Sequence, residues 1–429
     1  MKKVIPPVKG TRDFYPEQMA IRTWLYNTAR EVAESFGYQE YEAPLLESLE
    51  LYVARSGDEL VRDQAYVFAD RGGEQIALRP ELTASLARMI AQRQGELAFP
   101  VRWWSFGPFW RYERPQRGRT REFFQWNVDM LGASSPEADA ENVAVLASFL
   151  RKVGLTPTQV LILVNDRRLM DASFEELAIP AATRPALSSL LDRRTKVPDD
   201  EWRREASDLG LSTAQLGKLE ALVRDGDLWK RSPELPRFFA AIDALGVSDF
   251  VRFDASIVRG LQYYTGTVFE AWEVGGAIRR SLLGGGRYDR LLSDVGGAPL
   301  PAVGFALGDV VMTLLLEKYQ LLPAELVVFP ADFLVTVFDV PGHLSSLQLA
   351  AELRAAGLRV AVYPDAEKLS RQFKYADRIK ARVALVLGPD EIAGGQVTLK
   401  NLRTGAQQTL PRAGVVAACR GILEAPVPG

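Results

Sequence analysis

Apolar side chains recur at helical spacing near the start of the chain. From Trp24 to Phe36 they repeat at intervals of three or four residues, which places them on one face of a helix. Gly37 follows this run, and a glycine commonly ends a helix. The pattern predicts a long helix over residues 17–36 that leads into a strand over 38–44.

Downstream, alternating and continuous apolar runs predict strands. These runs lie at 66–68, 75–78, 102–109, 123–131, 251–253, 267–272 and 279–283. A helical pattern occupies 137–153, and residues 168–245 are rich in Leu, Arg, Asp and Glu with helical periodicity. We therefore expect an α+β domain in which an antiparallel sheet is flanked by helices, with a helical insertion at about 168–245.

The pattern changes after a Leu-rich helix that closes this first domain. Apolar runs at 333–338, 359–363 and 383–387 alternate with helical stretches of about 15 residues, an order typical of parallel βαβ units. We expect a large domain over 1–322 and a separate α/β domain over 327–429.

Composition narrows the classes of protein that fit this pattern. The 429 residues are 47% hydrophobic and 25% charged, as in an ordinary globular protein of two or three domains. The single cysteine, Cys419, and the single histidine, His343, exclude an internal disulfide, a Cys-rich zinc site and Ser-His-Asp catalysis. The net charge of -2 argues against a non-specific nucleic-acid coat and leaves room for local basic patches.

The sequence also bears on location. Met1–Lys3 runs at once into Pro6 and Pro7, without the apolar core of a signal peptide. The most apolar stretch, 302–316, contains Asp309 and falls short of the roughly 18–20 uninterrupted apolar residues that a membrane span requires. We expect a cytoplasmic protein with no membrane partner.

The most informative window is 111–121, which holds five arginines in eleven residues. Pro115 and Gly118 mark a hairpin loop between two predicted strands. A guanidinium binds phosphate through two parallel hydrogen bonds and stays charged at any working pH. The window therefore suits a polyphosphate or a nucleic-acid backbone, with a solvated basic hairpin as the alternative.

The usual glycine-rich nucleotide loops are missing. The sequence has neither a P-loop nor the dinucleotide fingerprint, so a Walker loop does not hold any ATP that binds here. The run Gly284–Gly286 could cradle a phosphate, although consecutive glycines more often permit a bulge or a close approach of the backbone to a ligand.

Several motifs together resemble the histidyl-tRNA synthetases, which are class II aminoacyl-tRNA synthetases. They are the arginine window, Arg79–Thr83, Arg259–Gly266, Lys9–Asp13, Gly284–Asp289 and Lys368–Asp377. The resemblance covers essentially the whole chain. It implies the class II fold, a C-terminal anticodon-binding domain, and a homodimer built around the first helix and the strand that ends at Pro44.

The resemblance also implies the reaction. Histidine and ATP would give histidyl-adenylate and pyrophosphate, and the acyl group would then pass to the terminal ribose of tRNA(His). The nucleophile is the substrate's own carboxylate, so the reaction needs no catalytic His or Cys. The site must align an in-line displacement at the α-phosphate and stabilise its charge. Mg²⁺ is expected with ATP, and its ligands are left open.

By motif position, the resemblance assigns residues to ATP. Arg111 and Arg259 would grip the α-phosphate and the substrate carboxylate as charge develops. Arg119 would hold the γ-phosphate, Glu113 the adenine edge, and Phe123 would stack on the adenine ring. Ordinary strand core is the alternative for Phe123.

The residues assigned to histidine are Glu81, Thr83, Gln125, Asp129, Tyr263, Tyr264 and Tyr288. The first three would bind the α-amino group, since an ammonium needs oxygen acceptors around it. Asp129 would accept a hydrogen bond from the imidazole, Tyr264 would contact the other ring nitrogen, and Tyr263 and Tyr288 would shape the pocket. Core packing is the alternative for the tyrosine pair.

The residues assigned to tRNA fall into two groups. Arg114, Gln116 and Arg117 would approach the acceptor end. Arg371, Lys374 and Arg378 lie on the basic face of a predicted amphipathic helix over 368–382, which suits RNA phosphates in an anticodon-binding domain. A merely solvated helix is the alternative for this second group.

One departure from the family pattern bears on ATP. The third motif usually ends in Gly-x-Glu-Arg, and its arginine helps to bind ATP, whereas here Gly308 precedes Asp309–Val311. Either Arg287, Arg290 or another basic residue takes over the γ-phosphate, or ATP binding is impaired.

The alternative function is a synthetase-like regulatory subunit of ATP phosphoribosyltransferase, the enzyme that such subunits control in histidine biosynthesis. Such subunits typically lack the anticodon-binding domain and the Arg-Gly-Leu-x-Tyr-Tyr element. This chain has that element at 259–264 and the pattern of the additional domain, which favours the ligase.

Overall fold

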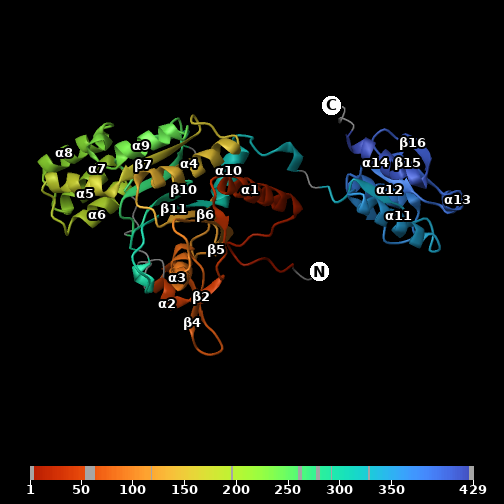
Figure 1. Ribbon diagram of the computed structural model, residues 1–429, viewed down its shortest axis with the longest axis horizontal. Helices are drawn as coiled ribbons and strands as arrows, with labels where there is room; N and C mark the ends of the chain where they lie inside the picture. The colour runs from red at the N-terminus through yellow and green to blue at the C-terminus, as the bar shows by residue number, and fades with distance from the viewer. Residues whose placement is uncertain are drawn as a thin grey trace. The chain divides into compact units, whose positions relative to one another are not determined.

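A computed structural model describes residues 4–53, 63–116, 118–194, 197–258, 263–276, 281–290, 292–326 and 329–424. They belong to two compact units, Met1–Leu326 and Val327–Gly429 (Figure 1). Among the described residues, none of the helices is both long and apolar enough to cross a membrane.

The large unit is built on an eight-stranded sheet with the order β1-β5-β6-β11-β10-β9-β7-β8. The strands are β1 (Gln39–Glu40), β5 (Val101–Trp110), β6 (Glu122–Leu131), β11 (Ala302–Gly308), β10 (Leu283–Arg287), β9 (Thr267–Glu273), β7 (Val160–Asp166) and β8 (Val251–Phe253). All inner pairs are antiparallel, while β1 with β5 and β7 with β8 pair in parallel. The expected antiparallel sheet flanked by helices is confirmed, with parallel pairs added at both edges.

Strand β6 divides its side chains between two faces. Trp126, Val128 and Met130 belong to the main hydrophobic core, and the Trp126 ring lies 4.9 Å from that of Phe149. Successive strand residues point to opposite faces. The face opposite this core therefore carries Phe123, Gln125, Asn127 and Asp129.

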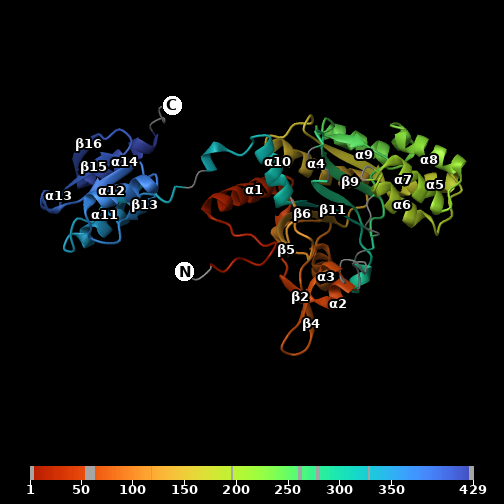
Figure 2. The same cartoon turned by 180° about the vertical axis from the view of Figure 1, so that it is seen from behind.

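The helices on the core side are α1 (Pro16–Ser35), α4 (Pro136–Lys152) and α10 (Asp309–Lys318). They lie above the sheet in Figures 1 and 2. The predicted first helix is confirmed, because α1 ends just before Gly37, which has φ of +79° and donates its N–H to Glu34 at 2.9 Å. A positive φ costs glycine little.

The strand expected over 38–44 is wrong in extent. Only β1 pairs with the large sheet there, and β2 (Leu46–Ser48) belongs to a second sheet with the order β2-β4-β3. Pro44 stands between the two strands and has no N–H to donate, which interrupts a ladder. The chain therefore changes sheets at this proline.

The second sheet carries the helix that covers the polar face of β6. Its other strands are β3 (Tyr66–Ala69) and β4 (Gln75–Leu78), followed by α3 (Thr83–Arg93), while α2 (Leu49–Val53) follows β2. Leu86, Ala87 and Ile90 of α3 pack with Tyr264 and Tyr288 in one buried cluster. In Figures 1 and 2, α3 lies below the large sheet.

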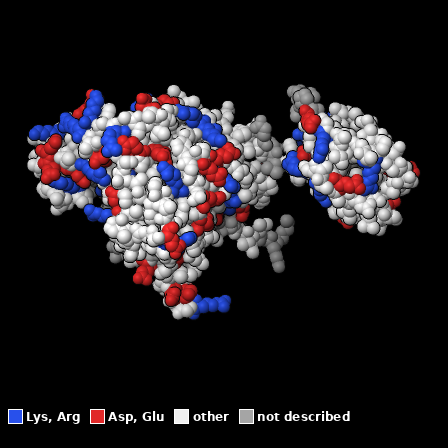
Figure 3. All heavy atoms as spheres, viewed as in Figure 1, with Lys and Arg blue, Asp and Glu red and all other residues white. Residues whose placement is uncertain are grey.

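The helical insertion is confirmed. It holds α5 (Arg167–Glu176), α6 (Arg184–Asp192), α7 (Asp199–Asp208), α8 (Thr213–Arg224), a short 3-10 helix (Leu228–Arg231) and α9 (Leu235–Ala244). Asp166 caps α5 by accepting from the N–H groups of Arg168 and Leu169 at 2.7 and 3.4 Å, which satisfies donors that a helix start leaves unpaired. Figure 3 shows Lys and Arg interspersed with Asp and Glu over these helices.

The small unit has a five-stranded sheet with the order β13-β12-β14-β15-β16. Its elements are β12 (Phe333–Val335), α11 (His343–Ala355), β13 (Val360–Val362), α12 (Leu369–Arg378), β14 (Val383–Val386), α13 (Pro389–Ala393), β15 (Gln396–Asn401), β16 (Gln407–Pro411) and α14 (Val415–Glu424). The expected parallel pairing holds for β13, β12 and β14, and an antiparallel hairpin extends the sheet. The helix predicted over 368–382 is too long. In the structure α12 ends at Arg378, and Lys380 adopts φ of +57°, which is not a helical angle.

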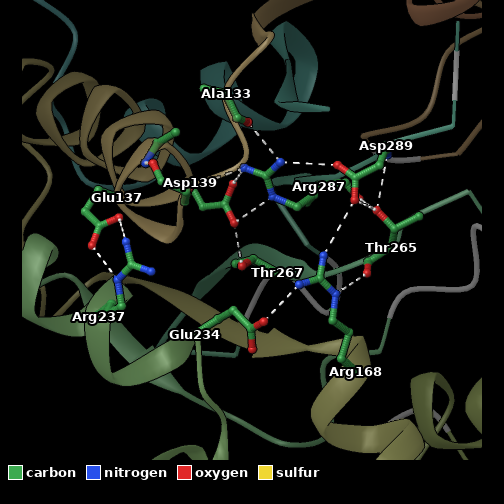
Figure 4. A network of polar contacts seen from close by, with 12 residues as sticks. Ala133, Glu137, Asp139, Arg168, Glu234, Arg237, Thr265, Thr267, Arg287 and Asp289 are labelled. Carbon is green, nitrogen blue, oxygen red and sulfur yellow. Dashed lines mark hydrogen bonds and ion pairs between the residues drawn. The ribbon is translucent and has the colours of Figure 1, made fainter. Parts of the chain in front are cut away.

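A buried ion pair fixes the end of β10 to α4 (Figure 4). Arg287 donates from Nη2 and Nε to the carboxylate of Asp139 at 2.6 and 3.1 Å, and Thr267 donates to the same carboxylate at 2.7 Å. Both charged side chains are 3% exposed. Burial raises the pKa of the Asp139 carboxyl, although Arg287 opposes that shift. The Arg287 guanidinium therefore stabilises the ionised Asp139 carboxylate in this interior.

Replacing Arg287 by Met should lower the free energy of unfolding of the large unit by about 3–5 kcal/mol, because Asp139 becomes a buried charge without its partner. Adding Asp139→Asn should recover much of that loss, since the amide carries no charge. Urea or thermal melts of the two variants measure the difference. Equal stability of the single and double variants would contradict this account of the pair.

Candidate active site

Arg111 follows β5 and lies against the segment that leads into α3. Its Nε donates to the carbonyl of Pro80 at 2.9 Å, and its guanidinium carbon lies 5.2 Å from the centroid of the Phe123 ring. No described residue accepts a hydrogen bond from its two terminal nitrogens. Burial lowers the pKa of Arg111, and the Glu113 and Glu81 carboxylates oppose that shift. The guanidinium still carries its charge near neutral pH and offers two donors to an anion.

The arginine-rich window forms the expected hairpin. Gln116 and Arg119 exchange backbone hydrogen bonds of 3.1 and 2.8 Å, with Gly118 at φ of +78°. Arg119 lies 3.3 Å from the Glu113 carboxylate and is 51% exposed. This geometry brings Arg119 and Glu113 to the same end of β6 as Arg111.

Two of the hairpin residues assigned to tRNA face solvent. Arg114 and Gln116 are both exposed, while Arg117 lies outside the described residues. Phe123 is half-buried, and its ring stacks on that of Phe109 with a centroid distance of 5.9 Å and an interplanar angle of 24°. Phe123 thus belongs to the strand core on one side and meets the Arg111 guanidinium on the other.

The residues assigned to the imidazole form a second cluster. The Tyr288 hydroxyl donates to the Asp129 carboxylate, and the hydroxyls of Tyr263 and Tyr264 lie 3.4 Å apart. The ring of Tyr263 is 4.5 Å from that of Tyr264 and 6.3 Å from that of Tyr288. Asp129 is 5% exposed and Tyr288 is 2% exposed. The structure therefore links the three tyrosines to one another and, through Tyr288, to the buried Asp129 carboxylate.

The cluster is possible only because its neighbours are glycines. A Cβ at Gly304, which pairs with Asp129 across the sheet, would lie 2.0 Å from the Asp129 Oδ1. A Cβ at Gly286 would lie 2.8 Å from Cδ1 of Tyr264. Both distances are shorter than any contact a methyl group tolerates, so only glycine fits at these positions.

The run Gly284–Gly286 is accordingly part of strand β10 and not a phosphate-binding loop. The strand expected over 279–283 lies too early, since β10 spans Leu283–Arg287 and residues 277–280 lie outside the described part of the chain. Of the two interpretations of this glycine run, the structure shows close packing: the missing side chains leave room for Tyr264 and Phe269 beside the strand.

The residues assigned to the α-amino group come from β6 and from the start of α3. Gln125 stands on the same face of β6 as Asp129, and Thr83 begins α3. Glu81 accepts a hydrogen bond from the N–H of Ala84 at 3.3 Å. Arg259, assigned to the α-phosphate and the substrate carboxylate, lies outside the described residues, as Arg117 does.

Tyr41, which no motif or periodicity marks as a site residue, also lies in this region of the structure. Its ring lies 5.3 Å from that of Trp103, and Trp103 pairs with Asp129 across the sheet. Its buried hydroxyl has no hydrogen-bond partner among the described residues. Burial raises the pKa of Tyr41 well above its ordinary value, with the Asp129 charge adding to the effect. In the sequence it is an unremarked strand residue.

Val311 stands where the third motif usually has its arginine, and it lies in the hydrophobic core. Val311 is 6% exposed and packs in the main hydrophobic cluster. The neighbouring Asp309 carboxylate accepts from the N–H of Phe124 at 2.9 Å and from Arg12 at 2.8 Å. This carboxylate ties the start of α10 to β6 and to the N-terminal segment.

Arg287 does not replace that arginine. Besides its two bonds to Asp139, its Nη1 donates to the carbonyl of Ala133 at 3.0 Å and to Asp289 at 3.2 Å. A guanidinium that is 3% exposed and committed in this way has no donor to offer a phosphate. Arg290, the other named candidate, is exposed.

Comparison with known proteins agrees with this geometry. Residues 10–309 match the family described as histidyl-tRNA synthetase, and residues 343–422 match the family described as anticodon binding domain. The chain is 37% identical over 419 residues to the chloroplastic/mitochondrial histidine–tRNA ligase of Arabidopsis thaliana, covering 95% of this chain and 85% of the relative.

Two further likenesses extend over the same length. The chain is 37% identical over 423 residues to the histidine–tRNA ligase of Haloarcula marismortui, covering 94% of this chain and 95% of the relative. Among solved structures, the histidyl-tRNA synthetase of Nostoc sp. PCC 7120 superposes with a TM-score of 0.80 at 26% identity, covering 98% of this chain and 100% of that one.

Replacing Gly304 by Ala should weaken histidine binding by about tenfold or more, a loss of about 1.4 kcal/mol, because the new methyl group displaces the Asp129 carboxylate. Gly308→Ala on the same strand is the matched control, since a Cβ there meets nothing within 4 Å. Calorimetry with L-histidine measures both, alongside melting curves. Wild-type affinity in G304A would show that Asp129 does not hold the ligand.

Proposed function

Because this chain belongs to the histidyl-tRNA synthetase family, we propose that the residues on the polar face of β6 carry out the reaction of a histidine–tRNA ligase. Histidine and ATP give histidyl-adenylate and pyrophosphate, and the acyl group then passes to the 3′ end of tRNA(His). The observation that carries the proposal is the buried Asp129 carboxylate held by Tyr288, on the same strand as Phe123, which lies at the end of β6 that adjoins the hairpin bearing Arg111 and Arg119.

In the first step the histidine carboxylate attacks the α-phosphate of ATP, and pyrophosphate leaves. Arg111 would neutralise the charge that develops there, because no described residue accepts from its two terminal nitrogens and a partly buried guanidinium acts more strongly than one in water. Arg259 would assist from the other side by motif position. Arg119 would hold the γ-phosphate, Glu113 the adenine edge, and Phe123 the ring face.

Histidine would be selected by hydrogen bonding more than by shape. Asp129, which accepts from the Tyr288 hydroxyl, would also accept the imidazole N–H, and Tyr263 and Tyr264 would close around the ring. A side chain without an N–H would desolvate this carboxylate and give it no hydrogen bond in return, which is the strongest basis for rejection. Glu81, Thr83 and Gln125 would bind the α-amino group.

We propose that Mg²⁺ enters with ATP. The described residues contain no group of three or more His, Cys, Asp or Glu side chains that could hold a metal ion. Mg²⁺ commonly keeps several waters and binds through substrate phosphates and one or two carboxylates, so the site fits a nucleotide-borne ion. Such an ion would add positive charge at the phosphates.

The assignments to tRNA and to assembly belong to the same proposal. Arg114, Gln116 and Arg117 would meet the acceptor end. Residues 1–322 would form the catalytic domain and 327–429 the anticodon-binding domain. In the latter, Arg371, Lys374 and Arg378 are all exposed on α12 at spacings of three and four, which places them on one face. Glu367 pairs with Arg371 at 2.7 Å and would have to yield to an RNA phosphate.

We further propose that the protein works as a cytoplasmic homodimer, built around α1 and the segment that ends at Pro44. A regulatory subunit of ATP phosphoribosyltransferase is the less supported alternative, since full-length relatives carry the name histidine–tRNA ligase. Binding of histidine without ATP chemistry would favour that alternative.

Arg259→Ala should slow histidyl-adenylate formation by about a hundredfold or more, the usual cost of removing one group that stabilises developing charge. The melting curve should be unchanged, because the role assigned is chemical. Charging of tRNA(His) with labelled histidine, under single-turnover conditions, measures the rate. Near wild-type charging by a variant with an unchanged melting curve would refute this role.

A further inference from the structure

Arg168 of the helical insertion contacts two segments of the catalytic unit (Figure 4). Arg168, in the first turn of α5, donates from Nε to the carbonyl of Thr265 at 3.0 Å. Its Nη1 donates to Glu234, just before α9, at 3.0 Å, and its Nη2 lies 3.6 Å from the Asp289 carboxylate. One guanidinium thus joins both ends of the insertion to two segments of the catalytic unit.

Those two segments carry the pocket tyrosines. Tyr264 immediately precedes Thr265, and Tyr288 immediately precedes Asp289. Thr265 donates from its hydroxyl to Asp289 at 2.7 Å and from its N–H to the carbonyl of Arg287 at 2.8 Å. The segments are therefore tied to each other, and Arg168 contacts both at the residue next to the tyrosine.

Gly266 lets the Arg168 guanidinium approach the backbone closely on one side. A Cβ at Gly266 would lie 3.2 Å from Nη2 of Arg168 and 3.1 Å from Cδ of Arg287. The two arginines differ in setting, because the Arg168 side chain is 48% exposed and that of Arg287 is 3% exposed. Exposed ion pairs contribute little to the stability of a fold. Loss of Arg168 should therefore have little effect on the free energy of unfolding.

We propose that Arg168 is a positioning residue for the histidine pocket, through which the insertion sets the placement of Tyr264 and Tyr288. This inference rests on the proposed function, because that function assigns the pocket to histidine. Arg168 itself touches no substrate. Its removal frees the Thr265 carbonyl and the Asp289 carboxylate, and small displacements of groups that hold a substrate have large effects on its binding and turnover.

The chain offers a matched control in Arg237. This α9 residue also joins the insertion to the catalytic unit, donating to the Glu137 carboxylate of α4 at 2.9 and 2.7 Å. Its side chain is 60% exposed, and it contacts neither tyrosine-bearing segment. Arg168→Ala and Arg237→Ala therefore remove comparable surface ion pairs of the insertion, of which only the first adjoins the pocket.

Histidine-dependent ATP–pyrophosphate exchange on the full chain tests the proposal. Arg168→Ala should raise the KM for histidine by about fivefold or more and leave the KM for ATP within about twofold, a selective coupling of ordinary size. Arg237→Ala should leave both constants at their wild-type values. Melting curves of both variants should lie together.

Either of two results would overturn the proposal. One is an Arg168→Ala variant whose KM for histidine equals that of Arg237→Ala. The other is a parallel rise in both constants with a lower melting temperature, the mark of a merely structural contact. If the wild type shows no exchange, the proposed function fails, and calorimetric titration of the same two variants with L-histidine still decides whether Arg168 positions the pocket.

Discussion

The ion pair between Arg287 and Asp139 is the interaction on which the arrangement of the site depends. It holds the end of β10 against α4 in an interior where either charge alone would be strongly destabilising. Tyr288 follows Arg287 directly, so its hydroxyl reaches Asp129 from a backbone that is already fixed. Asp289 then extends the same network to Thr265. The buried ion pair thus holds the neighbouring tyrosine in place before any substrate binds.

Strand β6 supplies the other half of the design by dividing its side chains. Trp126 and its alternate neighbours anchor the strand in the core, while Phe123, Gln125 and Asp129 face the site at a spacing set by the strand itself. Gly304 and Gly286 then leave the space that Asp129 and Tyr264 occupy. A rigid strand with glycine neighbours thus holds in a fixed spacing the residues that we propose for the nucleotide, Phe123, and for the imidazole, Asp129.

Much of the fold could be predicted from periodicity, because helix and strand repeats are local. The long first helix, the helical insertion and the α/β unit all follow from such repeats, and the strand over 123–131 predicted that Gln125 and Asp129 share a face. Local patterns fail where a distant partner or one backbone angle decides. They could not show that Tyr288 meets Asp129, 159 residues away in the sequence, that Arg287 is buried, or that Lys380 ends α12 early. The residue roles came from resemblance, and periodicity alone offered none of them.

This site is expected to activate histidine although Val311 replaces the usual third-motif arginine. The most direct test is pyrophosphate exchange into ATP by the purified chain with Mg²⁺ and without tRNA, comparing histidine with every other standard amino acid. We expect robust exchange of pyrophosphate into ATP with histidine and with no other amino acid. Absence of exchange in a protein that still binds histidine by calorimetry would contradict it and would favour a regulatory role for the same fold.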